Sequence, residues 1–236
     1  MSRGGYISSR AVIYGRVEED AVVYGPSRIG RNTFIDRWVQ VGYPSREKLL
    51  KVAESKFSSL DNVSDGATIG DRCIVRSHTI IYDNVSIGDN VEVGHGVLIR
   101  SNSTVGSRSK IGSFTQLDGE VHVGEEVIIQ SMVYLPHLTE VGDKVFIGPN
   151  VVVTNDKYPI GKLQGVKIGR NVILGANSTI LAGVTIGEDS VIGSGSIVTH
   201  DVPSSTVVIG APAKPYISRR EYEEKKKQLD KQQFLE

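Results

Sequence analysis

The chain has 236 residues and no net charge, because 27 Lys and Arg residues balance 27 Asp and Glu residues. This balance argues against the basic surface with which proteins hold nucleic acid, and no run of 18 apolar residues predicts a membrane-spanning helix. The first residues lack the apolar run of a secretory signal. The only cysteine, Cys73, occupies a repeat position typical of a small buried residue. We therefore expect a cytoplasmic protein that binds neither nucleic acid nor membrane.

A six-residue period of branched aliphatic residues begins near the N-terminus, at Val17, Val23, Ile29, Ile35 and Val41. A period of six fits neither a helix, at 3.6 residues per turn, nor a single strand, at 2.0. It predicts a chain that turns a corner every six residues and points one aliphatic side chain of each short strand inward. Repetition at a fixed hexapeptide period is typical of a β-helix.

Residues 43–62 interrupt this period. Tyr43, Pro44 and Ser45 break the pattern, and apolar residues then recur at helical spacing. Two interpretations remain open here. One is a short amphipathic helix with Ser45 as its N-cap, and the other is a solvent-exposed loop.

The longest block of repeats follows, with sixteen consecutive hexads from Val63 to Val153. Glycine often comes directly after the aliphatic residue, as in Ile69-Gly70 and Val105-Gly106. We expect a Gly or an Asn to relax the backbone at each bend.

A second interruption, residues 154–167, precedes six more hexads between Ile168 and Val198. Five, sixteen and six hexads make about nine triangular coils if three hexads form one coil. The charged residues that follow favour a helix that covers the second open end of the solenoid or packs on a neighbouring subunit.

The predicted fold is therefore all-β. We expect a parallel β-helix domain over residues 1–215, with insertions at 43–62 and 154–167, and a C-terminal α-helix over residues 216–236.

These hexads resemble those of the hexapeptide-repeat acyltransferases, which follow the form [Leu/Ile/Val]-[Gly/Ala/Glu/Asp]-x-x-[Ser/Thr/Ala/Val]-x. The resemblance covers about residues 17–215 and implies a left-handed parallel β-helix. The left hand of the helix is implied by the resemblance alone. The general rule for parallel crossovers would predict a right-handed connection.

The segment from Ile168 to Lys214 looks like the acetyl-CoA-binding end of that family. It contains Leu174-Gly175-Ala176-Asn177, Gly193-Ser194-Gly195 and Gly210-Ala211-Pro212. Such enzymes pack three subunits with parallel axes and hold CoA in the groove between neighbours. The resemblance thus implies a homotrimer with acetyl-CoA as co-substrate and no metal.

The same resemblance assigns residues to the cofactor. Those expected along the thioester and pantetheine are Gly175, Ala176 and Ser194, and those near the adenosine phosphates are Thr199, His200 and Lys214. The family usually has Lys at the position of His200, so Lys214 is the stronger candidate for a phosphate contact.

The insertion that begins Val153-Thr154-Asn155-Asp156 resembles the loop of sugar acetyltransferases that modify an amino sugar carried on a nucleotide. Galactoside- and maltose-type O-acetyltransferases have a catalytic His in the equivalent loop, where this chain has Lys157 or Tyr158. A neutral amine needs a positioned base less than a hydroxyl does. The resemblance is therefore closest to nucleotide-sugar N-acetyltransferases.

His137 is the candidate catalytic residue. It lies two places after an inward aliphatic residue, at the hexad position where lipid A acyltransferases of this superfamily carry their catalytic His. We expect His137 to take a proton from the attacking amine, with Glu140 or Asp156 orienting the ring. The alternative is an imidazole that merely lies on the surface.

Further contacts are expected around this histidine. A backbone N–H, such as that of Gly175, is expected to stabilise the oxyanion. The residues expected to contact the sugar acceptor are Tyr134, Glu140, Asn155 and Asp156.

Three alternatives remain. A transferase of O-acetyl or longer acyl groups to a small acceptor is the nearest. A zinc carbonic anhydrase of the same fold requires a close histidine pair, but the smallest spacing between histidines here is fifteen residues. A non-catalytic trimeric scaffold would not need the CoA-type motifs.

Overall fold

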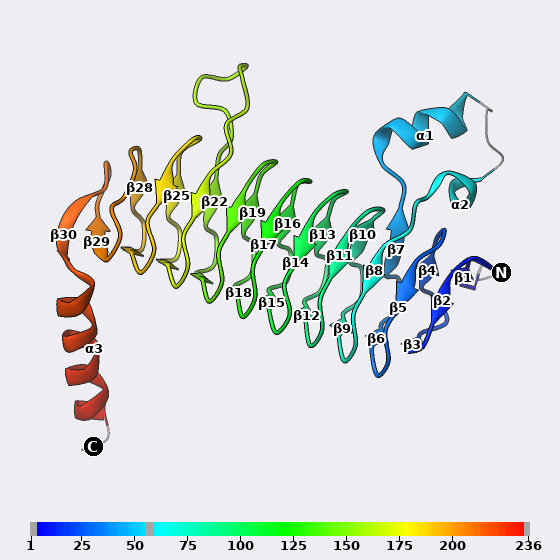
Figure 1. Ribbon diagram of the computed structural model, residues 1–236, viewed down its shortest axis with the longest axis horizontal. Helices are drawn as coiled ribbons and strands as arrows, with labels where there is room; N and C mark the ends of the chain where they lie inside the picture. The colour runs from blue at the N-terminus through cyan, green and yellow to red at the C-terminus, as the bar shows by residue number, and fades with distance from the viewer. Residues whose placement is uncertain (1–3, 55–58, 234–236) are drawn as a thin grey trace.

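The computed structural model describes residues 4–54 and 59–233, and they form a three-sided column of short parallel strands (Figure 1). Each coil contributes one strand to each of three sheets, here called A, B and C. Strands stack on the next coil, so that residues 18 apart are partners, as Ile81 is with Ile99. The predicted left-handed parallel β-helix is confirmed.

Sheet A has ten strands, all parallel: β1 Tyr6–Ile7, β4 Val22–Val23, β7 Gln40–Tyr43, β10 Ile80–Tyr82, β13 Leu98–Ile99, β16 Gln116–Leu117, β19 Tyr134–Leu135, β22 Val152–Val153, β25 Thr179–Ile180 and β28 Ile197–Val198. Sheet B has nine: β2 Val12–Ile13, β5 Arg28–Ile29, β8 Thr68–Ile69, β11 Ser86–Ile87, β14 Thr104–Val105, β17 His122–Val123, β20 Glu140–Val141, β23 Lys167–Ile168 and β26 Thr185–Ile186.

Sheet C has eleven strands: β3 Arg16–Val17, β6 Phe34–Ile35, β9 Ile74–Val75, β12 Glu92–Val93, β15 Lys110–Ile111, β18 Ile128–Ile129, β21 Phe146–Ile147, β24 Ile173–Leu174, β27 Val191–Ile192, β29 Thr206–Ile209 and β30 Lys214–Ser218. Only β30 runs antiparallel, against β29, among the described strands.

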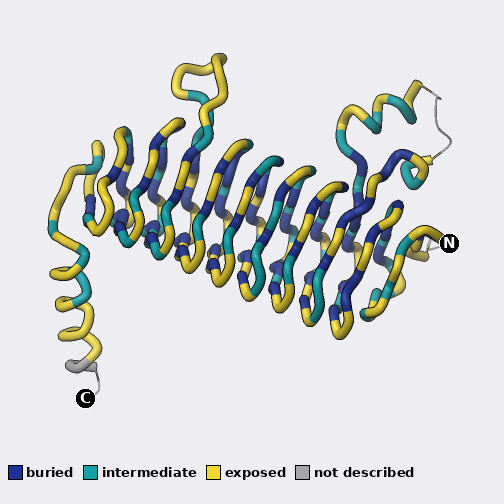
Figure 2. The backbone as a smooth tube through the Cα atoms, in the orientation of Figure 1, coloured by how far each residue is buried: buried dark blue, intermediate teal, exposed yellow. Residues whose placement is uncertain are grey.

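The core is the inside of the column. The second residue of most strands is the aliphatic residue of the hexad and is buried, and Figure 2 shows this buried band in the coils that follow the first, β1–β3. The fourth residue after it also points inward: Val85, Val91 and Val97 are each at most 2% exposed. Burial of a Val or Ile side chain contributes about 1.5–3 kcal/mol. The column is therefore stabilised along its whole length rather than at one centre.

The column has more coils than the nine predicted from the hexads. Its N-terminal end begins earlier, because β1 and β2 pair with β4 and β5 although their residues precede the first hexad. Its C-terminal end continues through β29, beyond the last hexad.

The glycines after the aliphatic residues serve a different purpose from the one predicted. A Cβ on Gly106 would lie 2.5 Å from the carbonyl carbon of Gly124 in the next coil, and the φ angle of Gly106 is not positive. Close stacking of coils therefore requires glycine at this place. The left-handed backbone falls two residues later, at positions such as Asn90 and Asn102, which Asn tolerates well.

Both insertions project from the same side of the column (Figure 1). The first contains the helices α1, Arg46–Ala53, and α2, Leu60–Val63. The expected helix is therefore present, but Ser45 occupies its N-cap position without a capping hydrogen bond from its side chain. The second insertion is a hairpin-like loop closed by an antiparallel bridge between Asp156 and Leu163.

The C-terminal helix α3, Arg219–Gln233, points away from the column instead of covering its end (Figure 1). Its Arg219 donates hydrogen bonds to the carbonyl oxygens of Asn171 and Asp189, while Leu229 is 62% exposed. Of the helices in residues 4–54 and 59–233, none has the length and apolar character to cross a membrane.

Candidate active site

Three corners join the sheets, and the candidate residues divide between two of them. The A–B corner follows each strand of sheet A, as residues 136–139 follow β19. The C–A corner precedes each strand of sheet A, as residues 175–178 precede β25. The two corners thus lie at opposite edges of sheet A.

His137 is held in a tight turn at the A–B corner. The amide of Thr139 donates to the carbonyl oxygen of Pro136 at 3.3 Å, and the Thr139 hydroxyl donates to the same oxygen at 2.7 Å. Leu138 takes the left-handed conformation, with φ of 69°, as the third residue of such a turn can require. The turn leaves the imidazole half-buried, with 36% of its side chain exposed.

A carboxylate that the sequence did not suggest lies beside this imidazole. Nε2 of His137 is 3.3 Å from Oε2 of Glu120, one coil below. Gly119, with φ of 95°, lies under the ring, where even a Cβ atom would come within 3.4 Å of Nδ1. A carboxylate at one ring nitrogen fixes the orientation of a histidine ring.

The carboxylate that lies against the His137 ring is thus that of Glu120, whereas Glu140 and Asp156 have other partners. Glu140 lies on sheet B, where its carboxylate pairs with Lys167 at 3.4 Å. Asp156 uses its carboxylate to shape its own loop, by accepting hydrogen bonds from the amides of Tyr158 and Gly161.

The base of the second insertion packs directly on the turn of His137. The side-chain amide of Asn155 donates to the carbonyl oxygen of His137 at 3.4 Å. At the other end of the insertion, Gly165 lies so close to Leu138 that a Cβ atom would be 2.1 Å from the Leu138 carbonyl oxygen. Asn155 therefore anchors the second insertion to the backbone of this turn.

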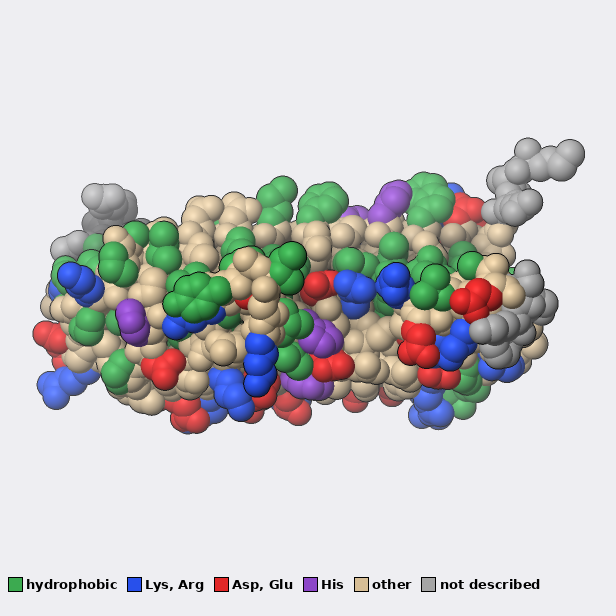
Figure 3. Space-filling view, turned by 90° about the horizontal axis from the view of Figure 1, so that it is seen from above, with side chains coloured by type: hydrophobic (Ala, Val, Ile, Leu, Met, Phe, Trp, Pro, Cys, Tyr) green, Lys and Arg blue, Asp and Glu red, His purple; other side chains and the backbone are tan. Residues whose placement is uncertain are grey.

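A groove of about 520 Å³ joins these residues to the first insertion. Residues of the A–B corner form its floor, and α1 and the second insertion contribute to its walls; its lining includes His137, Asn155, Arg100, Asp118, Ser45, Arg46 and Glu47. The two insertions project on the side seen in Figure 3, where acidic, basic and histidine side chains occur near the middle of the column.

The floor of this groove is polar, and its charged residues Arg100 and Asp118 neutralise each other. Arg100 pairs with Asp118 at 2.6 Å and lies over the ring of Tyr82, 5.8 Å from its centroid. The predicted acceptor contact Tyr134 donates its hydroxyl to Asp118 at 3.1 Å, which places it next to the groove on the face of sheet A. Glu140 does not line this groove and instead borders another, of about 890 Å³, on sheet B.

The residues expected along the pantetheine lie together at the C–A corner. A Cβ on Gly175 would be 2.4 Å from the amide nitrogen of Ser194, so these residues stack on adjoining coils. The amide of Gly195 donates to the carbonyl oxygen of Ala176 at 2.8 Å. Gly175, Ala176 and Ser194 therefore form one continuous track.

The amide of Gly175 is not free to bind an oxyanion, because it donates to the carbonyl oxygen of Ile192 at 2.8 Å. In the described part of the chain, the amide of Ala176 has no such acceptor. Ser194 likewise has no such acceptor among the described residues, so the N–H groups of Ala176 and Ser194 are those of this track available to a ligand.

Two of the remaining residues expected to bind the cofactor, Thr199 and His200, follow β28 and lie at the A–B corner. The hydroxyl of Thr199 is 2.9 Å from Nδ1 of His200. Lys214 is exposed, and the preceding amide of Ala213 donates to Ile197 in β28, two residues before Thr199. Thr199 and His200 thus lie in contact after β28, whereas Lys214 pairs with Ile209 of β29.

Within the described ranges, no three His, Cys, Asp or Glu side chains converge as metal ligands do.

Comparison with known proteins agrees with this architecture. The model of the family described as bacterial transferase hexapeptide (six repeats) matches residues 63–101 and 165–200. A 2,3,4,5-tetrahydropyridine-2,6-dicarboxylate N-acetyltransferase of Staphylococcus carnosus is 44% identical over 88 residues, which cover 37% of this chain and 36% of that enzyme. A galactoside O-acetyltransferase of Escherichia coli is 34% identical over 83 residues, or 31% of this chain and 41% of that enzyme.

Among solved structures, a UDP-N-acetylglucosamine acyltransferase from Campylobacter jejuni superposes with a TM-score of 0.62. The alignment covers 87% of this chain and 73% of that one at 16% identity, so this likeness concerns the fold alone. The chain spans less than half the length of either curated relative named above.

The repeat, the three-sheet column and the matched hexads define a hexapeptide-repeat β-helix protein. Over residues 63–101 and 165–200 its hexads are similar to those of the bacterial transferase hexapeptide family.

Proposed function

We propose that this protein transfers the acetyl group of acetyl-CoA to the amino group of a nucleotide-linked amino sugar. The observation that carries the proposal is the imidazole of His137 in a groove, paired with Glu120 and bordered by a loop that interrupts the repeat. Its relatives include both N- and O-acetyltransferases, which supports acetyl transfer as the reaction.

His137 acts as the general base. As the amine nitrogen attacks the thioester carbon, the imidazole takes the proton that the nitrogen loses, and Glu120 stabilises the imidazolium that forms. The N–H of Ala176 donates to the oxyanion of the tetrahedral intermediate. Its collapse breaks the C–S bond, and the CoA thiolate leaves with the proton returned by His137.

One copy of the chain cannot align these groups. His137 and Ala176 lie at opposite edges of sheet A and two coils apart, which amounts to roughly 15–20 Å at the usual strand and coil spacings. Reacting atoms must approach to about 3–3.5 Å. We therefore place acetyl-CoA in the groove between two copies of a homotrimer, with His137 from one and the Gly175, Ala176 and Ser194 track from the other.

The other assigned residues have supporting roles in this arrangement. Asn155, Asp156 and Tyr134 lie on the acceptor side. Thr199, His200 and Lys214 lie where the adenosine phosphates of CoA would end, and Lys214 supplies the positive charge. Glu140 has no role in this site.

An O-acetyltransferase is the second candidate, because a hydroxyl acceptor has the greater need of a histidine paired with a carboxylate. The similarity to the galactoside O-acetyltransferase favours it as well.

The test is mass spectrometry after incubation with acetyl-CoA and a panel of nucleotide-linked amino sugars and free sugars. We expect one acetyl group on an amino sugar, stable to mild alkali, which removes ester-linked but not amide-linked acetyl groups. His137→Ala is expected to lower kcat about 100-fold or more, and Glu120→Gln less.

His122→Ala and Glu125→Gln are the matched controls, because these residues lie away from the groove. An absence of acetyl transfer to every acceptor would refute the proposed reaction. Unchanged turnover in His137→Ala would refute the assigned base.

A further inference from the structure

The helix α1 forms one wall of the groove that contains His137. Ser45, Arg46 and Glu47 line this groove together with His137 and Asn155. The helix belongs to the insertion and not to the repeating coils, so its position depends on specific contacts with the column.

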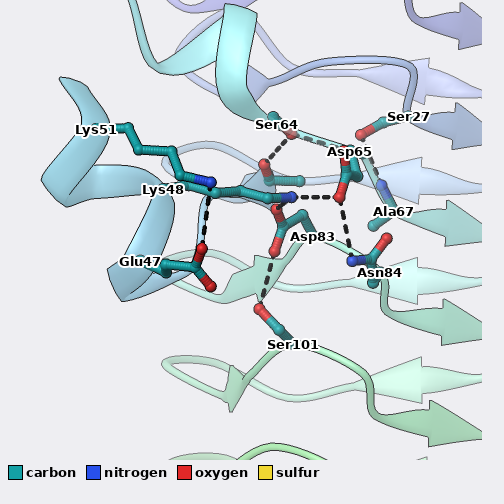
Figure 4. A network of polar contacts seen from close by, with 12 residues as sticks. Ser27, Glu47, Lys48, Lys51, Ser64, Asp65, Ala67, Asp83, Asn84 and Ser101 are labelled. Atoms are coloured by element: carbon teal, nitrogen blue, oxygen red, sulfur yellow. Dashed lines mark hydrogen bonds and ion pairs between the residues drawn. The ribbon is translucent and has the colours of Figure 1, made fainter. Parts of the chain in front are cut away.

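Lys48 provides these contacts (Figure 4). Its ammonium group reaches between Asp65 and Asp83 and forms an ion pair with each. Asp83 has only 1% of its side chain exposed, and its other carboxylate oxygen accepts a hydrogen bond from Ser101 at 2.9 Å. Ser101 itself lines the groove, so the ion pair joins α1 to the groove floor.

The charges of this cluster hold Lys48 in its protonated form. Burial alone would lower the pKa of Lys48, but its hydrogen bonds to Asp65 and Asp83 outweigh burial and raise the pKa. A buried carboxylate that loses its cation is left with an uncompensated charge. Breaking the ion pair between Lys48 and Asp83 would therefore cost free energy.

Among the described residues of this wall, Arg46 is a cation without an ion-pair partner. Glu47 pairs with Lys51 at 3.2 Å and Arg100 pairs with Asp118. The guanidinium of Arg46 is exposed and has no ion pair with any side chain in the described residues. An unpaired guanidinium in a groove is suited to bidentate contact with a phosphate or carboxylate.

We propose that α1 is the acceptor-recognition wall of this site, with Arg46 binding an oxyanion of the acceptor and Lys48 acting as the positioning residue that holds Arg46 over the groove. The oxyanion is a phosphate or a carboxylate of the acceptor. This inference rests on the proposed function, because it assigns the groove of His137 to the acceptor.

Steady-state kinetics with the accepted substrate tests the proposal. Arg46→Ala is expected to raise the KM of the acceptor by about tenfold or more, as loss of a charge-assisted contact does, with the KM of acetyl-CoA unchanged. Lys48→Met is expected to shift the same constant in the same direction, and Lys48→Arg to recover most of the loss.

Lys110→Met is the matched control, because Lys110 also pairs with a carboxylate, Glu92 at 3.2 Å, but on sheet C. Thermal unfolding of each variant identifies any that fail to fold. If Lys48→Met does not fold, Arg46→Ala still tests the proposal, because it removes only an exposed side chain. An unchanged acceptor KM in Arg46→Ala, or an equal rise for acetyl-CoA, would overturn the proposal.

A binding measurement separates this inference from the proposed reaction. Isothermal titration of the wild type with UDP, inorganic pyrophosphate and glutarate requires no turnover, and the three probes distinguish a nucleotide phosphate, a bare phosphate and a carboxylate. At least one is expected to bind wild type and to bind Arg46→Ala about tenfold more weakly. If none binds, or if Arg46→Ala binds equally well, the recognition role is wrong even where acetyl transfer occurs.

Discussion

The contact between His137 and Glu120 shows that side chains in a solenoid find their partners in the adjoining coil. His137 could be selected from the sequence because it follows an inward aliphatic residue at a corner. Its neighbour Glu120 lies 17 positions earlier, in the preceding coil, whereas the carboxylates expected beside the ring, Glu140 and Asp156, both follow His137 in the chain. Coils pair residues 18 apart, so the position below His137 is Gly119 and Glu120 is next to it. Counting back by one coil would have identified this carboxylate.

Replacement of Gly106 tests whether the close stacking of coils requires glycine at this position. Gly106→Ala places a Cβ atom 2.5 Å from the backbone of Gly124, and backbone cannot move aside as a side chain tip can. We expect a loss of about 1–3 kcal/mol or more in the free energy of unfolding, measured by urea denaturation. Gly195→Ala is the control, since its Cβ meets nothing within 4 Å and only its φ of 70° is unfavourable. Equal losses in both variants would argue against coil stacking as the reason for glycine.

The insertion at residues 43–62 shows which elements can be read from sequence. Apolar residues at helical spacing indicated a helix here, and α1 is present, although none of its residues is fully buried. The contact that places α1 was not predictable, because Asp83 occupies a corner position like many other polar residues and its burial depends on Lys48 arriving from the insertion. The acceptor wall was therefore missed, whereas the loop that contains Asn155 was found.

The short helix α2 is tied to the N-terminal coils through Asp61, and this contact depends on pH. Burial alone would raise the pKa of Asp61, but hydrogen bonds from the Gly25 amide and Ser8 and the charge of Arg10 outweigh burial and lower the pKa below its usual 3.8. The carboxylate therefore stabilises the fold fully above pH 3.8, and this contribution is lost as pH falls through the lower folded pKa.

Asp61→Asn is accordingly expected to reduce the free energy of unfolding at pH 7 by about 1–3 kcal/mol. The difference from wild type should begin to shrink as pH falls below 3.8, because the carboxyl group of the unfolded chain takes up a proton there, and should be lost as pH falls through the lower pKa of the folded protein. Urea denaturation at pH 7 and pH 3 measures both values. A difference that is the same at the two pH values would mean that the charge of Asp61 is irrelevant.

At the scale of the whole molecule, the hexad period determined which residues fill the column and in which register the strands stack. It did not determine the ends. The first coil and β29 lack the regular aliphatic spacing and form because the neighbouring coil offers unpaired backbone groups. Of the two positions expected for α3, covering the open end is not seen, and packing on a neighbouring subunit stays a prediction; the first turn of α3 is attached through Arg219.

The central claim is that the active site is divided between two copies of the chain, and mixing two inactive variants tests it most directly. His137→Ala removes the base at the A–B corner, and Ser194→Trp blocks the track at the C–A corner, where Ser194 is exposed. Each variant alone is expected to be inactive. Trimers formed from equal amounts of both should regain about a quarter of wild-type acetyl transfer, because one interface in four then combines an intact His137 with an intact Ser194. Mixed trimers that assemble but show no activity would contradict the account.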